Sequence, residues 1–151
     1  MKALDTNALV RFLVADHPGM KAKTDRLLDE AAANRESFGI TGYVLLEMLW
    51  VLKAVYKFSR EDILDAVDKL TAMPVLTFEP SCPVHELVAM ARNSNFDLAD
   101  ILIGLAARQQ NWETTLTLDK KAAQSELFEE IQSHAPRNED EENKRKVGGG
   151  R

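Results

Sequence analysis

The sequence is poor in cysteine, with Cys82 as the only one in 151 residues. A single thiol excludes an internal disulfide and is typical of proteins in a reducing compartment, so we expect a cytoplasmic location. Long apolar runs are also missing, because no stretch approaches the ~20 residues that cross a bilayer. The first residues place an acid, Asp5, where a secretory signal peptide needs its apolar centre. We therefore expect neither secretion nor a membrane partner.

The chain also has fewer basic than acidic residues. The chain has 19 lysine and arginine residues against 24 aspartate and glutamate residues, a net charge of −5. Segment 137–151 holds five basic and four acidic residues, which leaves 14 basic and 20 acidic residues, a net charge of −6, in 1–136. A protein that wraps duplex DNA with a basic surface does not fit this balance. The excess of acids instead raises the question of whether some of them surround a cation.

What the chain does contain is an alternation of β-rich and helical segments. Threonine and apolar residues concentrate in four β-rich segments, 2–5, 37–41, 74–78 and 114–119. Helical patterns lie between them, at about 16–34, 43–56, 59–70, 83–91 and 97–110. This order predicts an α/β fold with a central, mostly parallel sheet flanked by helices.

The alternating pattern ends well before the end of the chain, and we place the folded domain at residues 1–135. Segment 136–151 is polar and charged and includes three consecutive glycines. It has too little apolar surface to repay the entropy of ordering, so the sequence predicts a disordered tail there.

Four carboxylates stand beside apolar segments. Asp5 and Asp119 end β-rich segments, Asp100 precedes three aliphatic residues, and Glu47 interrupts 43–56, where 12 of 14 residues are hydrophobic. An unpaired buried carboxylate is costly, so these acids need basic partners or one shared divalent cation. Ends of parallel strands line the ligand crevice of open sheets, and oxygen ligands suit magnesium or manganese. We therefore expect Asp5 and Asp119 on adjacent or near-adjacent strand ends.

Each acid also has a simpler explanation on its own. Asp5, Asp97 and Asp119 are each suited to cap a turn or a helix, because a short carboxylate accepts hydrogen bonds from free main-chain N–H groups. Asp100 is suited to be the reciprocal acid at the third position of the helix that Asp97 caps. Glu47 is suited to form an ion pair with Lys53 or another basic residue. These explanations must be made one residue at a time, whereas one cation accounts for four acids together.

Four segments, in order, resemble the motifs of PIN-domain nucleases: LDTN at 4–7, VLLEMLWVL at 44–52, FDLADILIG at 96–104 and TLTLDKKA at 115–122. The resemblance extends from residue 1 to about residue 131 and is closest to the VapC-type toxins of toxin–antitoxin pairs. It implies a PIN-like fold and a magnesium- or manganese-dependent endoribonuclease that hydrolyses RNA. It also implies inhibition by a VapB-type antitoxin and a homodimer.

The resemblance assigns roles to residues one by one. The metal-binding and catalytic acids would be Asp5, Glu47, Asp100 and Asp119. Thr6 or Thr117 would position a water or a ligand with its hydroxyl, and Asn7 would brace the Asp5 loop. Asp97, one helical turn before Asp100, would be a supporting acid.

Basic residues near the acids are candidate RNA contacts. Arg11 lies one helical turn after Asn7, and Arg108 lies two turns after Asp100 on the same helical face. A solvated surface charge is the alternative for both arginines. Gly104 lies between Asp100 and Arg108, and a glycine within a helix costs about 1 kcal/mol relative to alanine, which indicates a close approach of another group there.

Two other functions are compatible with the sequence. One is a non-catalytic module on the same fold that binds nucleic acid or protein, which has no need of four acids. The other is a phosphatase or phosphotransfer domain with a strand-end aspartate as its nucleophile. Such hydrolases usually carry a second aspartate two residues later, and after Asp5 that position is Asn7.

Overall fold

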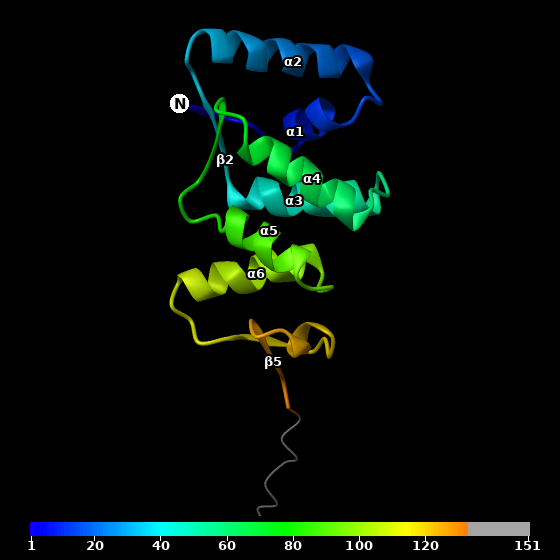
Figure 1. Cartoon of the computed structure of the whole chain (residues 1–151), viewed down its shortest axis with the longest axis vertical. Helices are drawn as coiled ribbons and strands as arrows, with labels where there is room; N and C mark the ends of the chain where they lie inside the picture. The colour runs from blue at the N-terminus through cyan, green and yellow to red at the C-terminus, as the bar shows by residue number, and fades with distance from the viewer. Residues whose placement is uncertain (133–151) are drawn as a thin grey trace, which may run out of the picture.

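The computed structural model describes residues 1–132, drawn in colour in Figure 1. The predicted tail over 136–151 lies outside the described residues, so the boundary at residue 135 stays a prediction. Strands and helices alternate, and every strand pair is parallel, which confirms the α/β class with flanking helices. The elements are β1 (Lys2–Ala3), α1 (Thr6–Leu13), α2 (Pro18–Ala33), β2 (Phe38–Ile40), α3 (Gly42–Ala54), α4 (Arg60–Thr71), β3 (Leu76–Phe78), α5 (Val84–Arg92), α6 (Leu98–Gln109), β4 (Thr115–Thr117), the 3-10 helix η1 (Ala122–Gln124) and β5 (Phe128–Glu130).

The five strands within residues 1–132 form two separate parallel sheets. The first has the order β1–β2–β3, with Lys2 opposite Phe38 and Phe38 opposite Leu76. The second pairs β4 with β5, with Thr115 opposite Phe128. Figure 1 shows the N-terminus and β5 far apart, with α5 and α6 between them along the long axis. Parallel strands were predicted, whereas their division into two sheets was not.

Helix α3 forms the centre of the hydrophobic core. Leu45, Met48 and Leu52 are completely buried on it, and α1, α4 and α6 pack against it. This burial explains the apolar sequence of the helix, although Tyr43 and Trp50 remain exposed. Within residues 1–132, no helix combines the length and the apolarity that crossing a bilayer requires.

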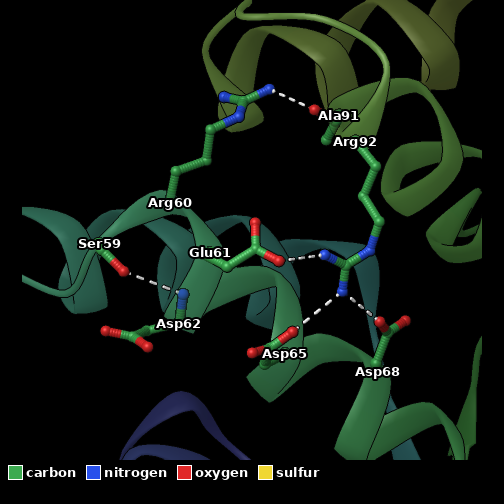
Figure 2. Close-up of polar contacts among 8 residues, drawn as sticks. All are labelled: Ser59, Arg60, Glu61, Asp62, Asp65, Asp68, Ala91 and Arg92. Carbon is green, nitrogen blue, oxygen red and sulfur yellow. Dashed lines mark hydrogen bonds and ion pairs between the residues drawn. The ribbon is translucent and has the colours of Figure 1, made fainter.

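Polar side chains fix where several helices begin. The Thr41 hydroxyl accepts a hydrogen bond from the Val44 N–H at the start of α3. Ser59 accepts one from the Asp62 N–H at the start of α4, 3.1 Å away, which Figure 2 shows. Such caps satisfy N–H groups that have no partner within the helix.

A cluster of charges joins α4 to α5. Arg92, the last residue of α5, reaches three acids on one face of α4: Glu61 at 2.8 Å, Asp65 at 3.1 Å and Asp68 at 2.6 Å (Figure 2). Hydrogen bonds that Arg92 donates to Asp68 and then to Asp65 raise the pKa of its guanidinium above the ordinary value. One arginine therefore balances the negative face of α4 at this junction.

The second sheet is seated on α6 through a glycine. A Cβ atom at Gly104 would lie 2.7 Å from Leu127 Cβ and 2.9 Å from Phe128 Cε2. Contacts that short are not tolerated, so only glycine allows the helix and β5 to come this close. The close approach predicted at this glycine is confirmed, and the approaching group is part of the protein itself.

Candidate functional site

The first pair of candidate acids lies around the start of α1. After β1 the chain turns, and Asp5 caps α1 by accepting a hydrogen bond from the Ala8 N–H at 2.9 Å. The next residue, Thr6, is buried, and its hydroxyl donates a hydrogen bond to Glu47 on α3 at 2.5 Å. We call Asp5, Thr6 and Glu47 the N-terminal half-site. The carboxyl groups of Asp5 and Glu47 are both solvent-exposed here, in keeping with an open binding position.

The remaining acids lie at the start of α6 and after β4. Asp97, Asp100 and Asp119 line one cavity of about 270 Å³. We call these three residues the C-terminal half-site. Cationic side chains line the same cavity, namely Lys53, Arg60 and Lys121. Acids and bases in one cavity allow an anionic ligand to approach despite the negative charge of the aspartates.

In the C-terminal half-site, the pKa values of Asp97 and Asp100 are shifted in opposite directions. Burial, followed by the neighbouring charges of Asp97 and Asp119, raises the pKa of Asp100. Burial also acts to raise the pKa of Asp97, but a hydrogen bond from Lys53 and two from main-chain N–H groups outweigh it and lower that pKa. The Lys53 ammonium lies 2.5 Å from Asp97. A cation beside Asp100 would offset both its burial and the negative charges of Asp97 and Asp119.

Asp119 lies in a tight turn after β4. Its Oδ1 accepts hydrogen bonds from the N–H groups of Lys121 at 2.8 Å and Ala122 at 3.1 Å. Its own N–H donates to the Thr117 hydroxyl at 3.0 Å. Thr117 therefore shapes the turn that presents Asp119, which is a more local task than holding a water or a ligand.

In residues 1–132, the two half-sites follow strands of two different sheets. The strands that lead to Asp5 and Asp119 belong to different sheets, so the expectation that they end on neighbouring strands is wrong for a single chain. Within residues 1–132, no three histidine, cysteine, aspartate or glutamate side chains lie close enough to hold one ion. A cation bound by all four predicted acids does not fit this arrangement.

The simpler explanations of these acids can also be judged. Asp97 caps α6 through hydrogen bonds from the Ala99 and Asp100 N–H groups, and Asp5 and Asp119 accept main-chain hydrogen bonds as described above. The alternative of an ion pair between Glu47 and Lys53 is wrong, because Glu47 binds Thr6 and Lys53 binds Asp97. Capping leaves carboxylate oxygen free, so it is compatible with a second role.

The candidate RNA contacts already have protein partners. Arg11 donates to both carboxylate oxygens of Asp16 at 2.8 Å and to the Tyr56 hydroxyl at 2.9 Å. Arg108 lies 3.2 Å from Glu126 and is exposed. Asn7 is exposed on the first turn of α1. These pairs are on the surface, where an ion pair contributes little and can exchange partners.

Two residues near the site were not predicted from the sequence to belong to it. Arg60 donates from its guanidinium to the carbonyls of Ala91 at 2.9 Å, Ser94 at 3.2 Å and Phe96, and so holds the loop that leads to Asp97; Figure 2 shows the bond to Ala91. Lys53, on α3, forms an ion pair with the side chain of Asp97 at the end of that loop. Its position as the second polar residue in an apolar helix was a usable signal, whereas Arg60 resembled an ordinary residue of a helix start.

Comparisons with known proteins bear on the whole of this region. A family model described as the PIN domain matches residues 2–126, a range that contains both half-sites. The chain is also similar to a protein described as VapC ribonuclease from Aquifex aeolicus (strain VF5). The two are 21% identical over 121 residues, which cover 80% of this chain and 89% of that protein.

Proposed function

The chain belongs to the PIN domain family, and from this we propose that it is a metal-dependent endoribonuclease, the toxin of a VapBC-type pair. The observation that carries the proposal is the cavity at the start of α6, which places Asp97, Asp100 and Asp119 together beside cationic side chains. The similarity to a VapC ribonuclease supports RNA as the substrate. A VapB-type antitoxin, a homodimer and a cytoplasmic location belong to the same proposal.

The proposal assigns magnesium or manganese to four acids, Asp5, Glu47, Asp100 and Asp119. Divalent cations in such sites activate water and stabilise the charge that develops on phosphate. Because the acids lie in two half-sites, the proposal requires that these half-sites meet when the protein is active. The chain's own cations have a separate task, since Lys53 and Lys121 lower the cost of bringing a phosphate toward aspartates.

A second function is favoured by one specific observation. The four acids do not form a common ion site in the described part of the chain, and two of them, Asp5 and Asp119, accept main-chain hydrogen bonds. This arrangement is what a non-catalytic module on the same fold, binding nucleic acid or protein, would retain. The two functions differ in whether RNA is cut and whether Asp100 is needed.

The test is RNA cleavage with and without magnesium. We expect wild type to cleave a mixed-sequence RNA with magnesium and to stop when the cation is chelated. Asp100→Asn should lower the rate about 100-fold or more, since even groups that only orient a metal ligand account for about 10- to 100-fold. The matched control is the variant Asp29→Asn, purified in the same way. Asp29 is an exposed acid on α2, so this variant should cleave RNA at the wild-type rate.

Two outcomes of the cleavage assay would contradict the nuclease proposal. If wild type, Asp29→Asn and Asp100→Asn all release the same trace of product, or if chelation changes nothing, the cleavage comes from a contaminant and the binding module is the better description. Filter binding of the same RNA by wild type would then separate a nucleic-acid module from a protein-binding one.

A further inference from the structure

We propose that a nucleotide of single-stranded RNA binds beside the C-terminal half-site, with its base stacked on Trp50 and its phosphates held by Lys53 and Lys57. We call these three residues the Trp50 subsite. The inference rests on the proposed function, because the RNA strand is the one that enters the cavity of that half-site. The subsite binds a nucleotide that flanks the one being cut, and it takes no part in the cleavage itself.

The Trp50 subsite lines a second cavity, of about 280 Å³, between the end of α3 and the start of α6. Pockets for small ligands run from roughly 300 Å³ upward, so this cavity is suited to a group as small as one base. Its wall is shared with the first cavity, since both are lined by Lys53, Ile63, Asp97 and Leu98. A strand with a phosphate in the first cavity therefore has its neighbouring nucleotide beside the second.

Trp50 presents an aromatic ring that the core does not use. Other large side chains of α3 are completely buried, namely Leu45, Met48 and Leu52, whereas Trp50 is 61% exposed. An exposed aromatic ring beside cations is typical of proteins that bind single-stranded nucleic acid, because every base has a face that stacks on a ring. Trp50 is therefore placed to hold an unpaired base.

The charge around this ring favours phosphate. Lys53 follows Trp50 by three residues on α3, which puts both on one helical face, and Lys57 lines the same cavity from the turn after the helix. The charged side chains that line the second cavity are two lysines and one aspartate, a net charge of +1, whereas the first cavity has three of each sign. In a chain of net charge −5, the second cavity thus offers a local excess of cations to a phosphate.

Lys53 can leave Asp97 for a phosphate without damage to the fold. The Lys53 side chain is 65% exposed, and ion pairs on the surface contribute little and exchange partners. Lys53 binds Oδ2 of Asp97, whereas Oδ1 accepts the hydrogen bonds from the N–H groups of Ala99 and Asp100. The cap of α6 therefore persists when Lys53 turns to RNA.

Lys57 has a backbone conformation that glycine adopts more easily. Its φ is 56°, in the left-handed region where a Cβ atom costs free energy. Its side chain is exposed and has no ion pair within residues 1–132. The lysine thus does not serve the shape of the turn, and its free ammonium is suited to a phosphate.

The decisive experiment uses tryptophan fluorescence, because the chain has two tryptophans and Trp112 lines a different cavity. In Trp112→Phe, Trp50 is the only tryptophan. A short single-stranded RNA of mixed sequence, added with a chelator to prevent metal-dependent cleavage, should quench its emission as a base stacks on the indole. The matched control, Trp50→Phe, keeps only Trp112, and its emission should not change. The corresponding RNA duplex should quench neither, because its bases are paired.

Fluorescence anisotropy of the same RNA, carrying a dye, measures affinity in chelator. Trp50→Ala should weaken binding about 5- to 150-fold, the range for one stacked base, with unchanged salt dependence. Lys53→Met and Lys57→Gly should each reduce the slope of log K against log salt concentration by about 0.7, the value for one phosphate on a single strand. The matched controls are Trp112→Ala and Lys23→Met, at exposed positions outside this cavity, and they should bind RNA as wild type does.

Lys57→Gly also separates binding from folding. Glycine relieves the left-handed backbone, so the Tm of this variant should not fall although it binds RNA more weakly. A variant whose Tm falls and whose salt slope equals that of wild type would refute the phosphate contact of Lys57.

The outcomes distinguish this inference from the proposed function. An unquenched Trp50, with wild-type affinity in Trp50→Ala, refutes the subsite, and cleavage by wild type with magnesium then leaves the nuclease proposal standing. Quenching of Trp50 in a protein that never cuts RNA supports the subsite and refutes the nuclease proposal. If Trp50→Ala binds RNA normally but loses an assembly that light scattering shows for wild type, the face binds protein and the subsite is refuted.

Discussion

Gly104→Ala should destabilise the protein, although the same change in the middle of a helix normally stabilises it. Alanine is favoured over glycine within a helix by about 1 kcal/mol. The new methyl group would lie 2.7 Å from Leu127 Cβ, an atom fixed to the backbone that cannot rotate away. Inserting a methylene into a packed site costs about 1–3 kcal/mol, and a contact this short belongs in the upper part of that range. The expected net loss is therefore about 1–2 kcal/mol.

The measurement is equilibrium urea unfolding, followed by helix circular dichroism. The matched control is Gly19→Ala, in the first turn of α2, where a Cβ would have no heavy atom within 4 Å. With no steric cost, this substitution should stabilise the protein by up to about 1 kcal/mol. The two identical substitutions thus shift the unfolding midpoint in opposite directions. A Gly104→Ala midpoint at or above that of wild type, with an unchanged urea dependence, would refute the close seating of β5 on α6.

Three further predictions test other contacts. Glu47→Gln should change the free energy of unfolding by less than about 1 kcal/mol, because the amide oxygen can still accept the Thr6 hydrogen bond, whereas RNA cleavage should collapse; a denaturation curve and a cleavage assay measure both. Tyr56→Phe should raise the pKa of Asp16 in an NMR titration, since the Tyr56 hydroxyl is the main cause of its lowering. The depressed pKa stabilises the fold above the ordinary carboxyl pKa, and this stabilisation is lost as the pH falls through the lowered value. The free energy of unfolding of the variant should therefore decrease less on acidification than that of wild type. Arg92→Ala should lower Tm, with a smaller difference at high salt, because three acids lose their cation; an unchanged Tm at low salt would contradict this.

Local features of the fold were predictable because they depend on neighbours in the sequence. The four β-rich segments contain β1 to β4, and the caps at Ser59 and Asp97 involve N–H groups within three residues. Strand β5 was not predicted, because Phe128–Glu130 carries two acids and reads as polar chain. Its strand conformation depends on pairing with β4, which no short pattern reveals.

The candidate site was predictable only in part. The PIN domain resemblance is confirmed, since the family model covers residues 2–126. The partners of the acids join positions far apart in the chain, as with Thr6 and Glu47 or Lys53 and Asp97, and these depend on how helices pack. The metal ligands and their supporting residues stay predictions.

Arg60 holds the loop before Asp97 entirely through main-chain carbonyls. A carbonyl is present whatever the residue, so the side chains at 93–96 can drift through many sequences while the aspartate keeps its position. The guanidinium has no such substitute, since lysine lacks the planar fork that reaches several acceptors at once. Mutational tolerance in this region is therefore uneven: a saturation library should accept most changes in the loop and reject nearly all at the single arginine on the neighbouring helix.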